Sequence, residues 1–331
     1  MSPASDRAPR GGIDLGGTKI QTVVVDPDNK VLGESRRPTP NTGGPEDVAR
    51  EIAAALREAA AQANLGTRDL AGVGIGSPGD ADERTGVVSG ARNLPGWEGA
   101  FPLGGHLSDR FGVPVRLGND VDVAVLGEFE LGAGRQFDTI LGIWWGTGVG
   151  GGLILDGKPW IGRGAAGEVG HIVVKRGGAR CTCGRKGCME AYAGRLAMEL
   201  KARKEVERGA KTDLFRIMEE RGRDRLTSGV WERALKHGDD LATRLIDRAV
   251  KALGTGIASA VNLLDPEAVI IGGGLGVRFG EKYVSRIATR MHPHLFVDDR
   301  PPHMHVATLG DLGGAIGAAL LVDERVPAPT A

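Results

Sequence analysis

The stretch from Glu168 to Glu190 reads EVGHIVVKRGGARCTCGRKGCME, and it guides the interpretation of the whole chain. It holds all three cysteines, and His171 precedes the first of them, Cys181, by ten positions. Structural zinc sites usually take four ligands from cysteine sulfur and histidine nitrogen. The sequence therefore predicts a structural zinc site made by His171, Cys181, Cys183 and Cys188. Three unpaired cysteines near an unrelated histidine are the alternative, and a disulfide would leave one cysteine over.

Two carboxylates, Glu168 and Glu190, bracket this segment. Closing the segment around a metal would bring the two glutamates near each other. We interpret the zinc as a clamp that holds Glu168, His171 and Glu190 against a polar ligand. The alternative is that both glutamates are ordinary surface residues.

Composition limits the classes of protein to which the chain can belong. Its 331 residues can form one large domain or two ordinary ones. Lysine plus arginine and aspartate plus glutamate each total 42, and this balance argues against a nucleic-acid partner. No apolar run approaches the roughly 20 residues that span a bilayer. The first residues, MSPASDRAPR, lack the apolar core of a signal peptide, so we expect a cytoplasmic protein.

A glycine turn joins two strands near the start of the chain. GGIDLGGTKIQTVVVD, residues 11–26, predicts a hairpin with Asp14 in its first strand and Gly16, Gly17 and Thr18 in its turn. Backbone N–H groups of such a turn can cradle phosphate. A plain hairpin turn is the alternative.

A second hairpin of the same plan lies in TILGIWWGTGVGGGLILDGK, residues 139–158. Its turn contains Gly146, Thr147 and Gly148. Two related hairpins, one opening each half of the chain, predict two α/β lobes of common design.

Helices are predicted at 45–64, 103–111 and 121–132 from the spacing of apolar residues. The strand predicted at 113–120 ends in Asn119-Asp120. A carboxylate at the end of a strand lies where open α/β sheets bind ligands, although a helix cap is the alternative.

Two further segments are candidates for ligand contact. Asn93 precedes Leu-Pro-Gly-Trp, where it could stabilise a turn or offer a ligand both an acceptor and a donor. The apolar strand predicted at 268–271 leads into Gly272, Gly273 and Gly274, which would let a ligand approach the backbone closely.

Taken in order, these motifs resemble the ROK family of sugar kinases, with the closest likeness to its bacterial ATP-dependent glucokinases. The resemblance covers residues 11–322. It rests on DLGGTK at 14–19, NLPGW at 93–97, GND at 118–120, GTGVGGG at 146–152, GEVGH at 167–171, CTCGRKGC at 181–188 and GGG at 272–274.

The resemblance implies an α/β fold, the two-lobe actin-like ATPase architecture of hexokinases, with a zinc-binding loop (171–188) in the large lobe. The small lobe would hold 11–118 plus 310–322, and the large lobe 119–309. Residues 1–10 and 324–331 would be disordered tails. One departure from the family is Trp144-Trp145 before the second glycine turn, and we expect both tryptophans to pack in the core.

The resemblance also implies roles for individual residues. Asp120 matches the catalytic base, and Asp14 matches an acidic residue near magnesium. The cofactors would be ATP, Mg²⁺ and a structural Zn²⁺ held by His171 and the three cysteines. The sugar ligands would be Asn93, Asn119, Asp120, Glu168, His171 and Glu190. The nucleotide would contact Gly16, Gly17, Thr18, Lys19, Gly146, Thr147, Gly148, Gly272, Gly273 and Gly274.

The implied activity is ATP-dependent phosphorylation of glucose to glucose 6-phosphate. Fructose, mannose or an N-acetylhexosamine are alternative acceptors, and polyphosphate is an alternative donor. A sugar-responsive repressor fits less well, because about ten residues before Gly11 are too few for a DNA-binding domain. We expect a homodimer or higher homo-oligomer, helped by small-residue helices at 252–261 and 310–320, with no nucleic-acid or membrane partner.

Overall fold

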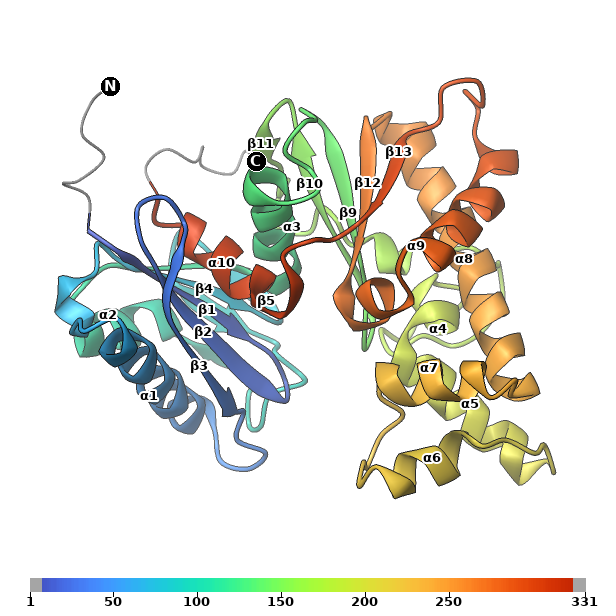
Figure 1. The fold of residues 1–331 in the computed structure, drawn as a ribbon, viewed down its shortest axis with the longest axis horizontal. Coiled ribbons are helices and arrows are strands. Elements are labelled where there is room, and N and C mark those ends of the chain that lie inside the picture. The colour runs from blue at the N-terminus through green and yellow to red at the C-terminus, as the bar shows by residue number, and fades with distance from the viewer. Residues whose placement is uncertain (1–7, 324–331) are drawn as a thin grey trace. The chain divides into compact units, whose positions relative to one another are not determined.

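The computed structural model describes residues 8–323, which divide into two compact units (Figure 1). The first unit holds the described residues up to Arg135, residues 158–165 and those from Thr308 onward. The second holds 136–157 and 166–307. Of the tails expected at 1–10 and 324–331, residues 1–7 and 324–331 lie outside the described residues.

A five-stranded sheet with the order β3-β2-β1-β4-β8 forms the centre of the first unit. Neighbouring strands of β1, β2 and β3 are antiparallel, so the predicted glycine hairpin is confirmed, whereas β4 and β8 run parallel to β1. The strands are β1 (Arg10–Leu15), β2 (Lys19–Val25), β3 (Val31–Pro38), β4 (Val73–Ser77) and β8 (Val115–Asn119).

The first strand begins at Arg10, one residue inside the tail expected to be disordered. The Arg10 guanidinium forms a buried ion pair with Asp323 and donates to Asn29 Oδ1 at 2.6 Å. These contacts fix Arg10, because a buried guanidinium needs an anionic or polar partner.

Opposite faces of this sheet bury alternate side chains. Val24 joins the core that also holds Ile52 and Leu56 of α1 (Pro45–Gln62). Val23 and Val25 instead contact Ala315 and Ala319, two residues of the small-residue helix α10 (Gly313–Leu320). The period of two along β2 therefore places one helix on each face.

Helix α10 lies close to its neighbours because glycines face it. A Cβ atom on Gly74 would collide with the carbonyl oxygen of Ala318, and one on Gly12 with that of Ala315. On the side of α3 (Asp120–Leu131), a Cβ on Gly317 would collide with the Val123 carbonyl. These contacts hold α3 in the first unit, so the division differs from the boundary expected at residue 119.

The buried carboxylate of Glu128, near the end of α3, also connects α3 to the segment that leads into α10. It accepts the N–H groups of Thr308 and Leu309, both at 2.8 Å. The chain that enters α10 is therefore fixed to α3. Smaller elements complete the first unit: η1 (Thr67–Asp69), α2 (Leu103–Phe111), η4 (Gly310–Leu312) and a three-stranded sheet of β5 (Asp80–Asp82), β6 (Val87–Ser89) and β7 (Ala100–Phe101).

A second five-stranded sheet has the order β11-β10-β9-β12-β13. Here β9 and β10 form an antiparallel hairpin, and β12 runs parallel to both β9 and β13. This repeats the plan of the first sheet and confirms the prediction of two α/β halves of common design. The strands are β9 (Ile140–Trp145), β10 (Val149–Leu155), β11 (Lys158–Pro159), β12 (Ala268–Gly272) and β13 (His303–Val306).

Several helices of the second unit are separated by short breaks near Gly209, Gly222 and Gly238. None of the helices within residues 8–323 has both the length and the apolar character needed to cross a bilayer. The helices are η2 (Val169–His171), α4 (Glu190–Ala193), α5 (Arg195–Glu207), α6 (Leu214–Glu220), α7 (Ser228–Lys236), α8 (Asp240–Leu264), α9 (Gly273–Met291) and η3 (His292–His294).

The small residues of α8 and α10 make contacts within the chain. A Cβ on Gly254 would lie 2.6 Å from the Arg290 Cβ, and one on Gly256 would collide with the Met189 sulfur. These stretches therefore give no support to a homodimer, and the oligomeric state stays a prediction.

We predict that Gly74→Ala destabilises the first unit by about 3 kcal/mol, because the added methyl group meets backbone that cannot rotate away. Urea unfolding followed by circular dichroism measures this. Gly105→Ala is the matched control, because a Cβ there meets nothing within 4 Å. That control should stabilise α2 by about 0.5–1 kcal/mol. Equal unfolding midpoints for Gly74→Ala and the parent chain would contradict the close packing.

Candidate active site

Four side chains of the second unit gather as the sequence predicted. The ligand atoms of His171, Cys181, Cys183 and Cys188 all lie within 4.8 Å of one another. The Sγ atoms of Cys183 and Cys188 are 3.8 Å apart, as are Cys181 Sγ and His171 Nδ1. Zn–S bonds of about 2.3 Å give a tetrahedron with edges of about 3.8 Å. These are free thiols at zinc-site spacing, far from the roughly 2.05 Å of a disulfide.

Glycines give the metal loop, residues 171–188, its shape. Gly184 and Gly187 have φ angles of 88° and 91°, in the left-handed region that favours glycine. The Gly184 N–H donates to the Cys181 carbonyl at 3.0 Å, and a Cβ on Gly187 would collide with the Lys175 carbonyl. The loop therefore turns tightly enough for Cys181, Cys183 and Cys188 to converge.

The two bracketing glutamates both reach this cluster. The Nε2 atom of His171, on the ring side away from the thiols, lies 3.7 Å from Glu168 Oε2. Glu190 Oε1 lies 3.5 Å from Cys181 Sγ and accepts the Thr182 hydroxyl at 3.1 Å. Glu168 is exposed, whereas Glu190 is half-buried. The structure thus brings Glu168, His171 and Glu190 together around the metal loop.

Glu190 also connects the metal loop to the second glycine turn. Its Oε2 atom accepts the Val149 N–H at 3.0 Å. A Cβ on Gly148 would collide with the same carboxylate oxygen, so a side chain there would displace the Glu190 carboxylate. Trp145 Nε1 donates to the Ala193 carbonyl at 2.8 Å, which holds the start of the turn to α4.

The third glycine run lies next to this turn. A Cβ on Gly146 would lie 3.9 Å from the Gly274 nitrogen. Gly273 has φ 77°, and a Cβ there would lie 2.7 Å from the Trp145 carbonyl oxygen. The backbone at Gly273 can therefore approach β9 this closely only as glycine.

The expectation that Trp144 and Trp145 both pack in the core is confirmed for Trp145 and wrong for Trp144. Trp145 is fully buried and meets Phe279 edge-on, with ring centroids 5.3 Å apart, as expected for a core residue. Trp144 is half-buried and lies over Gly272, where a Cβ would come within 2.7 Å of the indole ring.

The first unit holds the other predicted residues, beginning with Asp14 at the end of β1. Burial raises the pKa of the Asp14 carboxyl, and the positive charge of Lys19 lowers it in part. Asp14 also lies close to Gly314, where a Cβ would be 3.0 Å from its carboxyl carbon. The turn at 16–19 is closed by the Gly16 N–H, which donates to the Lys19 carbonyl at 2.9 Å.

Asn93 lies beside that first turn. Its carbonyl oxygen would be 2.9 Å, and its side-chain nitrogen 3.2 Å, from a Cβ on Gly17. The Asn93 side chain is exposed, so it is available to a ligand.

Asn119 and Asp120 form the junction between β8 and α3. Asn119 is the N-cap of α3, and its Oδ1 accepts the Val121 N–H at 2.9 Å. Asp120 is half-buried, and its Oδ1 lies 3.0 Å from the same N–H. Both side chains therefore lie at the start of α3, where Asn119 is the cap and the Asp120 carboxylate accepts the same N–H.

Sequence reasoning missed Thr182 and Arg195. Thr182 donates to Glu190, and Arg195 donates to the Thr147 hydroxyl at 2.8 Å. The second contact joins residues 48 positions apart, which no local pattern can signal.

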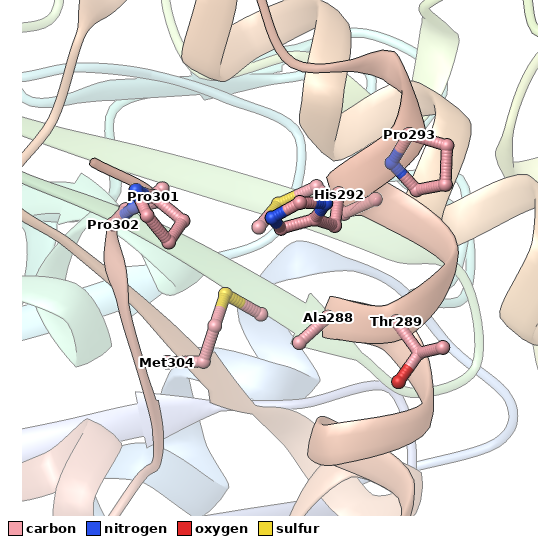
Figure 2. A pocket seen from close by; sticks show the side chains of 8 residues that line it. Ala288, Thr289, His292, Pro293, Pro301, Pro302 and Met304 are labelled. Carbon is pink, nitrogen blue, oxygen red and sulfur yellow. The ribbon is translucent and has the colours of Figure 1, made fainter. Parts of the chain in front are cut away.

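An apolar pocket of about 450 Å³ lies elsewhere in the second unit, between the end of α9 and the segment that leads into β13 (Figure 2). Its lining lacks lysine, arginine and carboxylate side chains, so it does not suit phosphate groups. The lining residues are Ala288, Thr289, Met291, His292, Pro293, Pro301, Pro302 and Met304.

Comparisons with known proteins place this geometry in one family. The glucokinase of Thermotoga maritima is 34% identical over 95% of this chain and 97% of its own length. The N-acetyl-D-glucosamine kinase of Pectobacterium atrosepticum is 32% identical over 94% and 97%. A ROK family glucokinase from Streptomyces griseus, solved with glucose and AMPPNP, superposes with a TM-score of 0.80 at 32% identity, covering 95% of this chain and 98% of that one. Residues 10–325 match the ROK family as a whole, and the chain therefore belongs to the ROK family.

Proposed function

We propose that this ROK-family sugar kinase transfers the γ-phosphoryl group of ATP to glucose and yields glucose 6-phosphate. The observation that carries the proposal is the half-buried Asp120 carboxylate at the carboxyl end of β8, beside the Asn119 amide. The choice of glucose is supported by the glucokinase relative and by the glucose and AMPPNP bound to the Streptomyces griseus protein.

Asp120 is proposed to act as the general base. A sugar hydroxyl is a poor nucleophile at neutral pH, and a carboxylate that accepts its proton contributes about 10²–10⁴-fold to the rate. Asn93 and Asn119 would direct hydrogen bonds to neighbouring hydroxyl groups, because an amide both donates and accepts. Glu168, His171 and Glu190 are the proposed ligands for the remaining hydroxyls.

The donor is proposed to bind at the glycine turns. Backbone N–H groups there would offset the charge of the phosphates. Asp14 fits a magnesium role, since hard cations prefer carboxylate oxygens. A nearby cation would also favour the ionised form of this buried carboxyl against the burial that raises its pKa.

The four-ligand cluster fits zinc. When bound there, zinc would neutralise the thiolates and fix the loop. The chain's own residues then do the positioning. His171 would use Nδ1 for the metal, which orients its Nε2 toward Glu168 and the sugar. The Glu190 carboxylate would be held between the loop and the Val149 N–H.

N-acetylglucosamine is a second candidate acceptor, because the Pectobacterium atrosepticum relative carries that activity in its name at nearly the same identity. The two acceptors differ at the sugar's 2-position.

A homodimer and a cytoplasmic location remain part of the proposal, supported by the family likeness.

Replacing the proposed base should greatly lower turnover and leave sugar binding unchanged. We expect Asp120→Asn to lower kcat by about 10²–10⁴-fold, because the amide keeps the shape and loses the basicity. Coupled ADP-release assays give kcat, and calorimetric titration gives glucose affinity. Asp109→Asn, an exposed carboxylate on α2, is the control. Near-normal turnover by Asp120→Asn would refute the assignment.

A hexose panel tests the acceptor. Glucose should give the highest kcat/KM, because each misplaced hydroxyl leaves a polar group unpaired at a cost of about 1–3 kcal/mol, or roughly 5- to 150-fold. Galactose, inverted beside Asp120, should be much poorer, with mannose and glucosamine the nearest competitors. If N-acetylglucosamine or fructose exceeds glucose, the acceptor assignment is wrong and the kinase assignment stands.

Metal analysis of the purified chain should find one zinc per molecule. Cys181→Ser should lose it and bind glucose more weakly, since the loop would no longer hold His171 and Glu190 in place. Lys186→Ala, an exposed change in the same loop, should keep both properties. Full glucose affinity in a zinc-free Cys181→Ser protein would argue against the positioning role.

A further inference from the structure

A guanidinium group lies at the second glycine turn. Arg195 is the first residue of α5, and its Nη2 donates to the Thr147 hydroxyl at 2.8 Å. Its backbone N–H donates to the Gly146 carbonyl at 3.1 Å. Arg195 is thus fixed to this turn through both its backbone and its side chain.

The positive charge of Arg195 lacks a direct anionic partner. No carboxylate of residues 8–323 lies within salt-bridge distance of it, and the oxygens of Glu199 already accept from Arg203 at 2.6 Å and from the Leu226 N–H at 2.9 Å. Burial lowers the pKa of the Arg195 guanidinium, Glu199 raises it in part, and Arg225 lowers it further. A partly buried cation with one neutral partner is costly, and a bound anion would offset that cost.

The turn itself presents donors beside this cation. Its carbonyls are occupied, since the Gly146 carbonyl accepts from Arg195 and the Thr147 carbonyl accepts the Leu196 N–H at 3.0 Å. Within the described part of the chain, the N–H groups of Thr147 and Gly148 donate to no protein acceptor. Two backbone donors and a guanidinium therefore converge on one short segment.

The charges around the second glycine turn would oppose phosphate binding without a cation. The Glu190 carboxylate reaches the same turn at Val149 and would repel phosphate groups. Arg278, which follows the adjacent Gly272–Gly274 run, is already paired with Glu232 at 3.0 Å. Arg195 is therefore positioned to offset the Glu190 charge and still attract an anion.

We infer that Arg195 binds the phosphate groups of the nucleotide donor at the Gly146–Gly148 turn. The inference deepens the proposed function and rests on it, because it takes this turn as part of the donor site. A guanidinium offers five N–H donors in a planar fork that matches phosphate geometry, and Thr147 engages only one of its nitrogens.

Calorimetric titration of the full chain with Mg²⁺-AMPPNP, adenosine and glucose tests this role in Arg195→Ala and Arg195→Lys. Losing charge-assisted bonds should raise the AMPPNP Kd of Arg195→Ala roughly 10- to 100-fold, with Arg195→Lys in between. The Kd for adenosine, which has no phosphate, and for glucose should stay unchanged. Arg208→Ala is the matched control, because Arg208 is an exposed arginine just after α5.

Two results would overturn the inference. One is an AMPPNP Kd that matches the parent chain. The other is an equal loss of adenosine and AMPPNP affinity, which indicates a damaged turn.

The proposed function fails separately. A parent chain that binds AMPPNP through Arg195 but phosphorylates no hexose refutes the function and keeps the inference. Efficient glucose phosphorylation with an unchanged ATP KM in Arg195→Ala refutes only the inference.

Discussion

The hydrogen bond from the Val149 N–H to the Glu190 carboxylate is the interaction on which the second unit's site depends. Glu190 begins α4 two residues after Cys188, and Val149 begins β10 directly after the second glycine turn. One carboxylate therefore connects the segment proposed to hold the sugar with the segment proposed to hold the phosphates. Gly148 leaves room for this carboxylate, since a side chain there would displace it.

This connection would give the cluster of His171 and the three cysteines a role beyond local stability. The loop at 171–188, with left-handed glycines at 177, 184 and 187, has little core of its own, so a metal can supply the folding energy that packing cannot. Once the loop is fixed, Glu190 and the Trp145–Ala193 hydrogen bond hold the second glycine turn in place relative to it. The proposed sugar ligands of the second unit and the second glycine turn would thus share one rigid support, as precise catalytic geometry requires.

The sequence predicted the parts of the structure that depend on local pattern. The two glycine hairpins, α1, α2 and the convergence of His171 with the cysteines follow from periodicity, turn residues and ligand spacing. The position of α3 in the first unit could not be predicted in this way. It depends on contacts that Gly317 and Glu128 make with residues nearly 200 positions away in the chain. The Arg195–Thr147 contact was missed for the same reason, since a lone arginine at the start of a helix resembles any surface arginine.

The position of α10 also has a consequence for how the chain folds during its synthesis. The first sheet is translated early, but α10, which covers Val23 and Val25, is made only after the entire second unit. Until then the sheet face lined by Gly12 and Gly74 has no helix to bury it, and exposed apolar strands are prone to aggregate. Burial of this sheet face therefore has to wait until the α10 segment, which follows the whole second unit in the chain, has been translated.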